Sequence, residues 1–325
     1  MIRVVFPWQQ QQWQYLTNRI NNKTLPHAIL LKGSSGLGKS TFALSLAAFL
    51  LCEQKQLTSS VCCGTCKSCK LIQANTHPDL HLLQLTDEHK VIKIEQVREI
   101  IDITSKKSHQ SGYQLIIIDP ADSMNIAASN ALLKTLEEPS DSTVFILVSS
   151  RPSAIPITIR SRCQHVIFNA PSKHIAETWL QKKNVLPENI DLLLSLTENA
   201  PLLSLQLAQG NFIQQRSQLL ENLNFLLRKQ LDPIKFATLF VDMDLRLLLS
   251  YLYSYFMDIL RIKFNLSEQI IVNSDYMATL YNLSSLITIT KIFSSLDKIL
   301  IISKYADNNL NRQLLLEDLG IAILN

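Results

Sequence analysis

A glycine-rich loop near the N-terminus, GSSGLGKS at residues 33–40, has the residue types that bind phosphate. Three of its residues are glycines: Gly33, Gly36 and Gly38. Glycines leave backbone N–H groups free to surround phosphate oxygens, while Lys39 can reach the outer phosphates and Ser40 can hold Mg²⁺. The loop therefore predicts a site for ATP with Mg²⁺. The alternative is a chance match at the start of a helix.

The stretch LIIIDPAD, residues 115–122, ends an apolar run with Asp119. Nucleotide hydrolases keep at this place the carboxylate that holds Mg²⁺ through water, and many keep the catalytic base at the next residue. Here the next residue is Pro120, which has neither a proton-accepting side chain nor a backbone N–H. We predict that Asp119 contributes to the Mg²⁺ site, the alternative being a capped strand end. Asp122 is interpreted as the cap of a turn or helix rather than as a displaced base.

Five of the six cysteines lie between Cys52 and Cys69. The spacing Cys63-x₂-Cys66-x₂-Cys69, with Cys52 upstream, supplies the four thiolates that a tetrahedral structural Zn²⁺ requires. Adjacent residues rarely direct both side chains to one ion, and Cys63 preserves the even spacing, so Cys62 is interpreted as a spare thiol. The predicted zinc ligands are Cys52, Cys63, Cys66 and Cys69.

Three alternatives to a zinc ion with four cysteine ligands are less favoured. An iron–sulfur run of the bacterial type needs a cysteine where this chain has Gln73. Disulfides need an oxidising compartment, and the N-terminus lacks the apolar core of a signal peptide. His77 and His81 are better explained as turn and strand residues than as ligands.

The sequence TIRSRC, residues 158–163, places Arg160 and Arg162 on a short loop. An arginine beside a nucleotide-binding domain can act as an arginine finger, which enters a neighbouring subunit's site and stabilises charge developing on the γ-phosphate. The common alternative is a solvated basic patch.

The composition is that of a folded protein. The chain has 325 residues, 47% hydrophobic and 18% charged, which predicts two or three globular domains and excludes a disordered chain. The net charge of +4 is weak evidence for an acidic partner. The most apolar segment, residues 245–262, is interrupted by Asp258 and is too polar for a membrane span. We expect a cytoplasmic protein.

The residues with chemical roles must be positioned by alternating strands and helices. Apolar runs typical of buried strands lie at residues 27–32, 79–85, 113–119, 142–150 and 163–170. Helical patterns lie between them at 39–52, 94–107 and 127–138. The last of these helices is expected to be capped by Ser123 or Asn125 and ended by Pro139. This alternation predicts an α/β fold, a parallel sheet with helices on both faces, with the phosphate loop at a strand-to-helix turn.

The strand pattern ends near residue 173. Short helices are expected up to residue 209, and long leucine-rich helices beyond it. We therefore predict a nucleotide-binding domain at 1–170 with a zinc module at 52–69, a small helical domain at 171–209 and an all-α domain at 210–325.

Five motifs, in this order and at these separations, are similar to those of the bacterial clamp-loader ATPase family of the AAA+ class: HAILLKGSSGLGKS, CGTCKSC, THPD, NALLKTLEEP and SRC. They cover residues 25–165 closely, whereas the helical remainder agrees only in length and character. The resemblance implies an AAA+ P-loop domain, a helical lid at 171–209, and a C-terminal collar at 210–325 that holds five subunits together.

The family contains gamma/tau motor subunits and a stator subunit of similar sequence. The motor type has Asp-Glu where this chain has Asp119-Pro120, and its lid carries an arginine that contacts nucleotide. The corresponding lid stretch here, SLTENAPLLSLQLA at residues 195–208, contains no arginine. Both departures resemble the stator type.

For this chain the resemblance implies that Arg162 acts in trans on a neighbouring gamma/tau subunit. The assembly would be a hetero-pentamer that also contains a delta subunit and loads the β sliding clamp onto primed DNA. The intact phosphate loop is compatible with ATP binding, and ATP hydrolysis by this chain itself is expected to be weak or absent. Two rival functions are an active gamma-type motor ATPase and a zinc-dependent DNA-binding protein that uses Lys67 and Lys70.

Overall fold

The computed structural model describes residues 4–54, 61–85, 91–104, 112–139, 142–305 and 310–324. The chain divides into two compact units. Unit 1 consists of Met1–Ala176 with Ala200–Leu203, and unit 2 of Glu177–Asn199 with Ser204–Asn325. The three-domain division expected from the sequence stays a prediction.

Unit 1 is built around a parallel sheet with the strand order β2-β3-β4-β1-β5. Its strands are β1 (Ala28–Lys32), β2 (Leu80–Gln84), β3 (Gln114–Asp119), β4 (Thr143–Ser149) and β5 (Gln164–Ile167). All neighbouring pairs are parallel; in β1, for example, Leu30 lies opposite Leu147 of β4 and His165 of β5. The five predicted strands and their parallel arrangement are confirmed. Because parallel strands end at a common edge, the loops that follow β1, β3 and β4 come together there.

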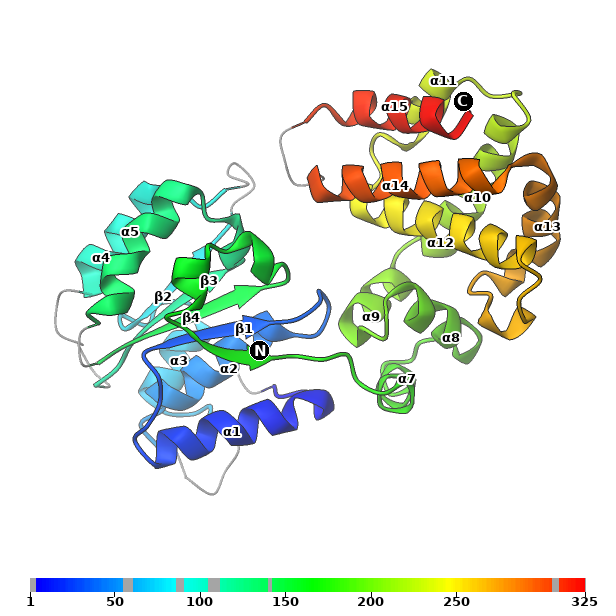
Figure 1. Ribbon diagram of the computed structural model, residues 1–325. Helices are drawn as coiled ribbons and strands as arrows, with labels where there is room; N and C mark the ends of the chain where they lie inside the picture. The colour runs from blue at the N-terminus through cyan, green and yellow to red at the C-terminus, as the bar shows by residue number, and fades with distance from the viewer. Residues whose placement is uncertain are drawn as a thin grey trace. The chain divides into compact units, whose positions relative to one another are not determined.

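Helices cover both faces of this sheet, with α1, α2 and α3 on one side and α4 and α5 on the other (Figure 1). The helical segments are η1 (Pro7–Gln9), α1 (Gln10–Asn21), α2 (Lys39–Leu51), α3 (Lys67–Gln73), α4 (Ile94–Thr104), η2 (Ala121–Ser123), α5 (Ile126–Glu137), η3 (Pro152–Ala154) and α6 (Ile157–Arg160). Along β1, Ile29 and Leu31 pack into the core under α2, and Ala28 and Leu30 into the core under α5. Burial on both faces explains why these strands read as continuous apolar runs.

Helix α5 has a clear beginning and end. Asn125 is its N-cap, since the Asn125 Oδ1 atom accepts a hydrogen bond of 2.7 Å from the backbone N–H of Ala128. The prediction of Ser123 or Asn125 is therefore settled in favour of Asn125. The helix ends at Glu137, two residues before Pro139.

Every regular element among the described residues of unit 2 is a helix. The helical segments from residue 173 onward are α7 (Lys173–Gln181), α8 (Pro187–Leu196), α9 (Pro201–Gln209), α10 (Phe212–Leu227), α11 (Pro233–Phe240), α12 (Leu245–Lys263), η4 (Glu268–Ile270), η5 (Ser274–Tyr276), α13 (Met277–Leu286), α14 (Ile289–Tyr305) and α15 (Arg312–Leu324). The apolar side chains from α10 onward form one core, to which α12 contributes a long buried face. Among the described residues, no helix combines the length and hydropathy of a membrane span.

A buried polar network joins α10, α12 and the segment before α13. Asp258 is fully buried, and both of its carboxylate oxygens accept hydrogen bonds. Oδ1 accepts from Arg261 and from the backbone N–H of Val272, and Oδ2 accepts from the backbone N–H and the side-chain amide of Asn273. Asn273 in turn accepts a hydrogen bond of 2.8 Å from the buried guanidinium of Arg216. The network fixes an irregular segment against two helices by satisfying its polar groups.

Candidate functional site

The phosphate loop connects β1 to α2, as the sequence predicts, and two of its glycines cannot be replaced without rearrangement. Gly38 is the N-cap of α2 with φ of 79°, and a Cβ atom there would lie 2.6 Å from the ring of Phe6. A Cβ atom on Gly33 would lie 2.2 Å from the carbonyl oxygen of Phe168. Only glycine fits both places, so the loop can bring its backbone and the positive end of α2 close to a phosphate.

Lys39, the first residue of α2, is only 4% exposed. Its Nζ donates to two carbonyl oxygens of the phosphate loop, each at 2.7 Å, and to the hydroxyl of Ser150 at 3.1 Å. Burial lowers the pKa of Lys39 to about 8, and the carboxylates of Asp119 and Asp122 oppose this shift. The amine therefore lies inside the loop, where phosphate oxygens can replace the loop carbonyls as its partners.

Ser40 and Asp119, the residues predicted to serve Mg²⁺, are in contact. The carboxylate of Asp119 accepts a hydrogen bond from the Ser40 side chain. Burial raises the pKa of Asp119, and the Ser40 hydrogen bond and the charge of Lys39 partly reverse this shift. A hydroxyl and a buried carboxylate side by side fit Mg²⁺, whose charge would stabilise the ionised carboxylate. The peptide bond that follows, between Asp119 and Pro120, is cis.

Asp122 is occupied in holding the end of β4. Its Oδ1 accepts hydrogen bonds from the Ser149 hydroxyl at 2.6 Å and the Ser150 backbone N–H at 3.3 Å. Its Oδ2 pairs with the guanidinium of Arg151 at 3.1 Å. With both oxygens engaged and 4% of the side chain exposed, Asp122 holds the end of β4, which differs from the cap of a turn or helix expected from the sequence.

A cavity of about 300 Å³ lies where the loops of the sheet edge meet. It is lined by Ser35, Gly36, Gly38, Lys39, Ser40, Thr41, Asp119, Pro120, Val148, Ser150 and Leu202. The fold thus brings together all the phosphate and Mg²⁺ residues predicted from the sequence except Gly33, which does not line the cavity. Chemically, the cavity offers a cation, a hydroxyl and a carboxylate for a Mg²⁺-bound phosphate.

Sequence reasoning missed the N-terminal segment and Ser150. Gln9 is fully buried, and its Nε2 donates to the carbonyl oxygens of Leu37 at 2.8 Å and Gly38 at 3.1 Å, while Trp8 Nε1 donates to Leu37 at 3.0 Å. These bonds brace the phosphate loop. No local sequence pattern predicts these hydrogen bonds. For Ser150 a signal existed, because polar residues that end a buried parallel strand share an edge with the other strand ends.

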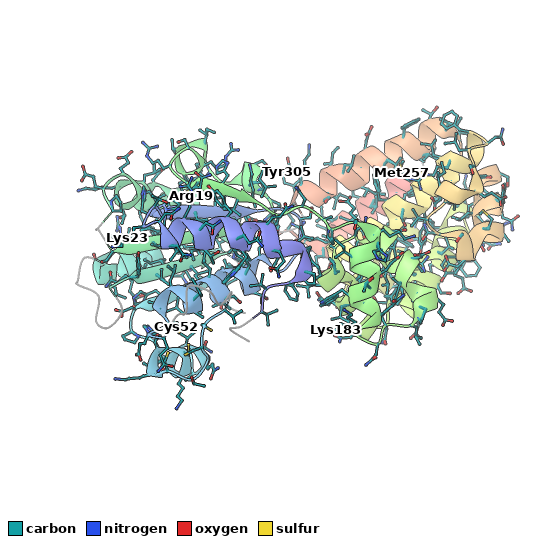
Figure 2. The ribbon with its side chains drawn as sticks, turned by 90° about the horizontal axis from the view of Figure 1, so that it is seen from below. Arg19, Lys23, Cys52, Lys183, Met257 and Tyr305 are labelled. Carbon is teal, nitrogen blue, oxygen red and sulfur yellow. The ribbon has the colours of Figure 1, made fainter. Side chains whose placement is uncertain are left out.

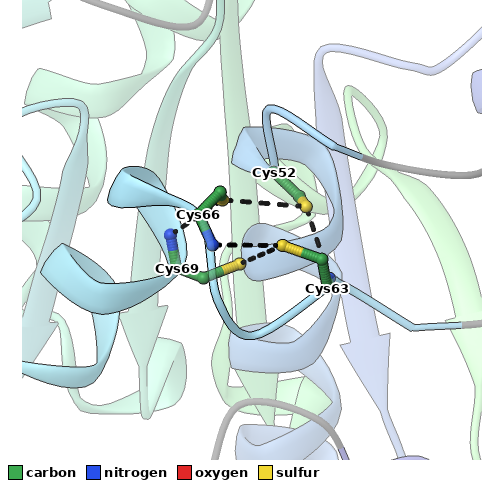
Figure 3. Close-up of side chains that lie close together, drawn as sticks. All are labelled: Cys52, Cys63, Cys66 and Cys69. Carbon is green, nitrogen blue, oxygen red and sulfur yellow. Dashed lines mark hydrogen bonds between the residues drawn. The ribbon is translucent and has the colours of Figure 1, made fainter.

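The second predicted site is a cluster of four cysteines, whose Sγ atoms all lie within 4.8 Å of one another. The cluster forms where Cys52, directly after α2, meets the small helix α3 (Figure 2). The Sγ atoms of Cys52 and Cys66 lie 4.0 Å apart, and those of Cys63 and Cys69 lie 3.9 Å apart. Figure 3 shows the four side chains close together. A tetrahedral ion with Zn–S bonds of about 2.3 Å separates its sulfurs by about 3.8 Å. The geometry fits zinc.

The surroundings of the sulfurs differ in how they affect the thiolate forms. The backbone N–H groups of Thr65 and Cys66 lower the pKa of the Cys63 thiol to about 6. Burial raises the pKa of the Cys52 and Cys69 thiols, so a cation is needed to stabilise their charged forms. The four-cysteine donor set therefore suits a divalent ion that prefers sulfur.

The neighbouring residues that were considered as ligands lie outside this cluster. Cys62 is buried in the apolar core of unit 1, whereas Cys63 is one of the four clustered cysteines. His77 bonds to the Ser68 hydroxyl at 2.9 Å through Nε2 and accepts the backbone N–H of Asp79 at 3.1 Å through Nδ1. His77 thus ties α3 to the start of β2. His81 lies within β2, as a strand residue.

Arg162 lies on the surface of unit 1, after α6. Its guanidinium donates a hydrogen bond of 2.9 Å to the carbonyl oxygen of Thr158 and pairs with the carboxylate of Glu137. About a third of the side chain, 35%, is exposed. The next residue, Cys163, is buried, and burial raises the pKa of its thiol to about 12. Neither Thr158 nor Glu137, the two partners of Arg162, lines the phosphate cavity of this chain. The predicted arginine finger and the predicted nucleotide site therefore lie at different places.

Comparison with known proteins decides the family. The family described as "DNA polymerase III, delta subunit" matches residues 8–172, and its C-terminal counterpart matches residues 210–323. A Pseudomonas aeruginosa protein named DNA polymerase III subunit delta' is 33% identical over 97% of this chain and 96% of its own length. The chain belongs to the DNA polymerase III delta-prime family.

Other delta-prime relatives match a smaller share of the chain. The Haemophilus influenzae subunit is 34% identical over 73% of this chain and 71% of its own, and the Escherichia coli subunit is 32% identical over 68% and 66%. Among solved structures, a Thermotoga maritima gamma subunit-related protein aligns over 96% of this chain and 98% of its own, with 20% identity and a TM-score of 0.47. The three relatives from Pseudomonas, Haemophilus and Escherichia are all named subunit delta', the subunit type that the sequence motifs favour over the gamma/tau type.

Proposed function

We propose that this chain is the stator of a DNA polymerase III clamp loader and that it lends Arg162 to the ATP site of a neighbouring gamma/tau motor subunit. The assembly is a hetero-pentamer that also contains a delta subunit and that loads the β sliding clamp onto primed DNA. Its site of action is the cytoplasm. Membership of the delta-prime family supports the assembly. The role of Arg162 rests on its position in the fold.

One observation carries this role. The guanidinium of Arg162 is partly exposed on a loop whose backbone is fixed by hydrogen bonds from Ser161 to Ile157 at 2.9 Å and from Arg162 to Ile159 at 3.0 Å. An arginine finger needs such a fixed base and an accessible charge, because it must enter a site on another subunit. At the chain's own cavity, by contrast, Pro120 stands in the position of the base.

The test is Arg162→Ala in a loader reconstituted with motor and delta subunits, with ATP turnover measured in the presence of clamp and primed DNA. Removing a finger lowers turnover at the affected site by about 10³ to 10⁵ where such sites have been dissected. Arg98→Ala, which changes an exposed arginine of α4, is the matched control. DNA-stimulated turnover equal to that of the unaltered loader would contradict the assignment.

The cavity of this chain is proposed to bind ATP with Mg²⁺ and to hydrolyse it weakly or not at all. Support comes from the intact phosphate loop, the buried Lys39 and the contact between Ser40 and Asp119. Equilibrium binding of ATP to the isolated chain, with and without Mg²⁺, tests this part of the proposal. Lys39→Ala should abolish binding, and equal affinities of the two proteins would overturn it.

The contact between Ser40 and Asp119 also supports a second candidate function, that of a gamma-type motor ATPase. Ser40 and Asp119 are arranged as a hydrolase would need them, and only the base and a lid arginine are lacking. ATP hydrolysis by the isolated chain, with Lys39→Ala as control, separates the two functions. We expect no strong hydrolysis, and none after Pro120→Glu alone, because the lid stretch 195–208 contains no arginine.

The helical part of the chain is proposed to supply a lid at 171–209 and the collar at 210–325. Exposed apolar side chains on α14 support the collar: Ile289, Phe293, Leu300, Ile301 and Tyr305. Apolar side chains in water are typical of surfaces that another subunit covers. Charged substitutions at Phe293 and Leu300 should prevent incorporation into the pentamer, as judged by size-exclusion chromatography, while leaving the isolated chain folded.

The four cysteines are proposed to bind a structural Zn²⁺ that ties the end of α2 to α3. The alternative DNA-binding role of this module depends on Lys67 and Lys70, both exposed on α3. Zinc removal that abolished DNA binding by the complex but left assembly intact would favour that alternative.

A further inference from the structure

The guanidinium of Arg162 is held from two sides by groups of its own chain. Nη1 donates a hydrogen bond of 2.9 Å to the carbonyl oxygen of Thr158 in α6. Nη2 pairs with the carboxylate of Glu137, the last residue of α5. Arginine carries five N–H donors in a planar fork, so these two contacts leave further donors for a phosphate.

The backbone beneath Arg162 is fixed to the sheet. His165 of β5 bonds through Nε2 to the carbonyl oxygen of Arg160 at 2.8 Å, and its Nδ1 lies 3.4 Å from the Nζ of Lys32 in β1. A carbonyl oxygen only accepts hydrogen bonds, so His165 Nε2 carries the proton and Nδ1 accepts from the lysine. Cys163, buried in the core on the α5 side, anchors the loop just after Arg162. What remains adjustable is the arginine side chain itself.

A free arginine side chain samples many rotamers, and most of them would miss a neighbouring active site. Contact with Glu137 restricts this freedom before the subunits meet, and preorganisation of this kind favours binding and catalysis alike. Glu137 is itself placed well for the task. It ends a helix whose start is capped by Asn125 and whose inner face is buried, so its position is set by the core.

We propose that Glu137 is a positioning residue for Arg162, holding the guanidinium in the orientation from which it reaches the γ-phosphate bound by the neighbouring subunit. This inference rests on the proposed function of Arg162. The alternative is that the Glu137 carboxylate only neutralises the charge of Arg162. In that case removing the carboxylate would strengthen the attraction between Arg162 and phosphate and raise turnover.

The experiment uses the reconstituted loader with clamp, primed DNA and ATP, and compares Glu137→Gln, Glu137→Ala and Glu137→Asp. Half of the Glu137 side chain is exposed, so its substitution leaves the fold intact. Glu138→Gln, a change of the adjacent exposed glutamate, is the matched control. We expect Glu137→Ala to lower kcat about two- to fivefold with the KM for ATP unchanged, the size of effect that an exposed ion pair supports. Glu137→Gln, which keeps an acceptor, should lose less.

A double-mutant cycle with Arg162→Ala separates the possible outcomes. Positioning requires that Glu137→Ala has no further effect once Arg162 is absent. A loss that persists in the Arg162→Ala background, an unchanged kcat or an increased kcat would each overturn the role of Glu137. If Arg162→Ala itself leaves turnover unchanged, the proposed function fails first, and the two failures are thereby told apart.

Discussion

The carboxylate of Asp122 accepts a hydrogen bond of 2.6 Å from the hydroxyl of Ser149, at the end of the neighbouring strand β4. The same oxygen accepts the backbone N–H of Ser150, whose hydroxyl contacts the amine of Lys39. The acid that follows the strand of Asp119 thus shapes the cavity from outside it. It supports the residue that touches Lys39 and does not itself line the cavity.

Asp122→Ala is therefore expected to reduce stability. The change leaves the Ser149 hydroxyl and the Ser150 N–H without their acceptor, and one buried unsatisfied polar group costs about 1–3 kcal/mol. The free energy of unfolding in urea measures the loss. Asp297→Ala, at an exposed position of α14, serves as control and should be nearly neutral. A variant of full stability with impaired nucleotide chemistry would instead identify Asp122 as a displaced base.

Nucleotide affinity is expected to depend on pH through Lys39. Burial lowers the pKa of this amine to about 8, so the free protein carries the charge only below that pH. Bound phosphates stabilise the ammonium and raise its pKa in the complex. Affinity should therefore change little below pH 8 and fall by up to about tenfold per pH unit above it.

Titration calorimetry from about pH 7 to about pH 9.5, a range that brackets the shifted pKa, measures this dependence. Lys39→Arg is the control, because a guanidinium keeps its charge throughout. If the wild-type chain and the arginine variant showed the same pH profile, another group would be responsible.

Zinc content is expected to distinguish the two adjacent cysteines. Cys63→Ser removes one of four converging thiolates, whereas Cys62→Ser changes a core residue that is not among them. The first variant should lose most of its zinc and the second should keep about one ion per chain. Metal analysis by mass spectrometry of the purified proteins provides the measurement. Zinc retained by Cys63→Ser and lost by Cys62→Ser would reverse the ligand assignment.

The buried network of unit 2 is expected to be a major source of its stability. Asp258→Ala leaves the backbone N–H groups of Val272 and Asn273 without partners, and Arg261 without its counter-charge. The expected loss is about 3 kcal/mol or more, measured by chemical unfolding. Asp258→Asn, which keeps part of the hydrogen bonding, should lose less; equal stability of both variants and the original chain would show that the network contributes nothing.

Much of unit 1 follows from local sequence. Continuous apolar runs specify strands buried on both faces, as in β3 and β4, and the intervening helical patterns require parallel connections. The glycines of the phosphate loop, the spacing of Cys63, Cys66 and Cys69, and the presence of Pro120 after Asp119 are likewise properties of the chain alone. They reflect short-range geometry, which a few neighbouring residues determine.

The tertiary structure decided the contacts between residues far apart in sequence. Strand order brought Ser150 to Lys39, and packing at the end of α5 brought Glu137 to Arg162. Periodicity shows which face of an element is buried but carries no record of its partner across the fold. Such pairings arise only when the sheet has been ordered and its helices packed, because side-chain contacts depend on the combined burial of all the elements.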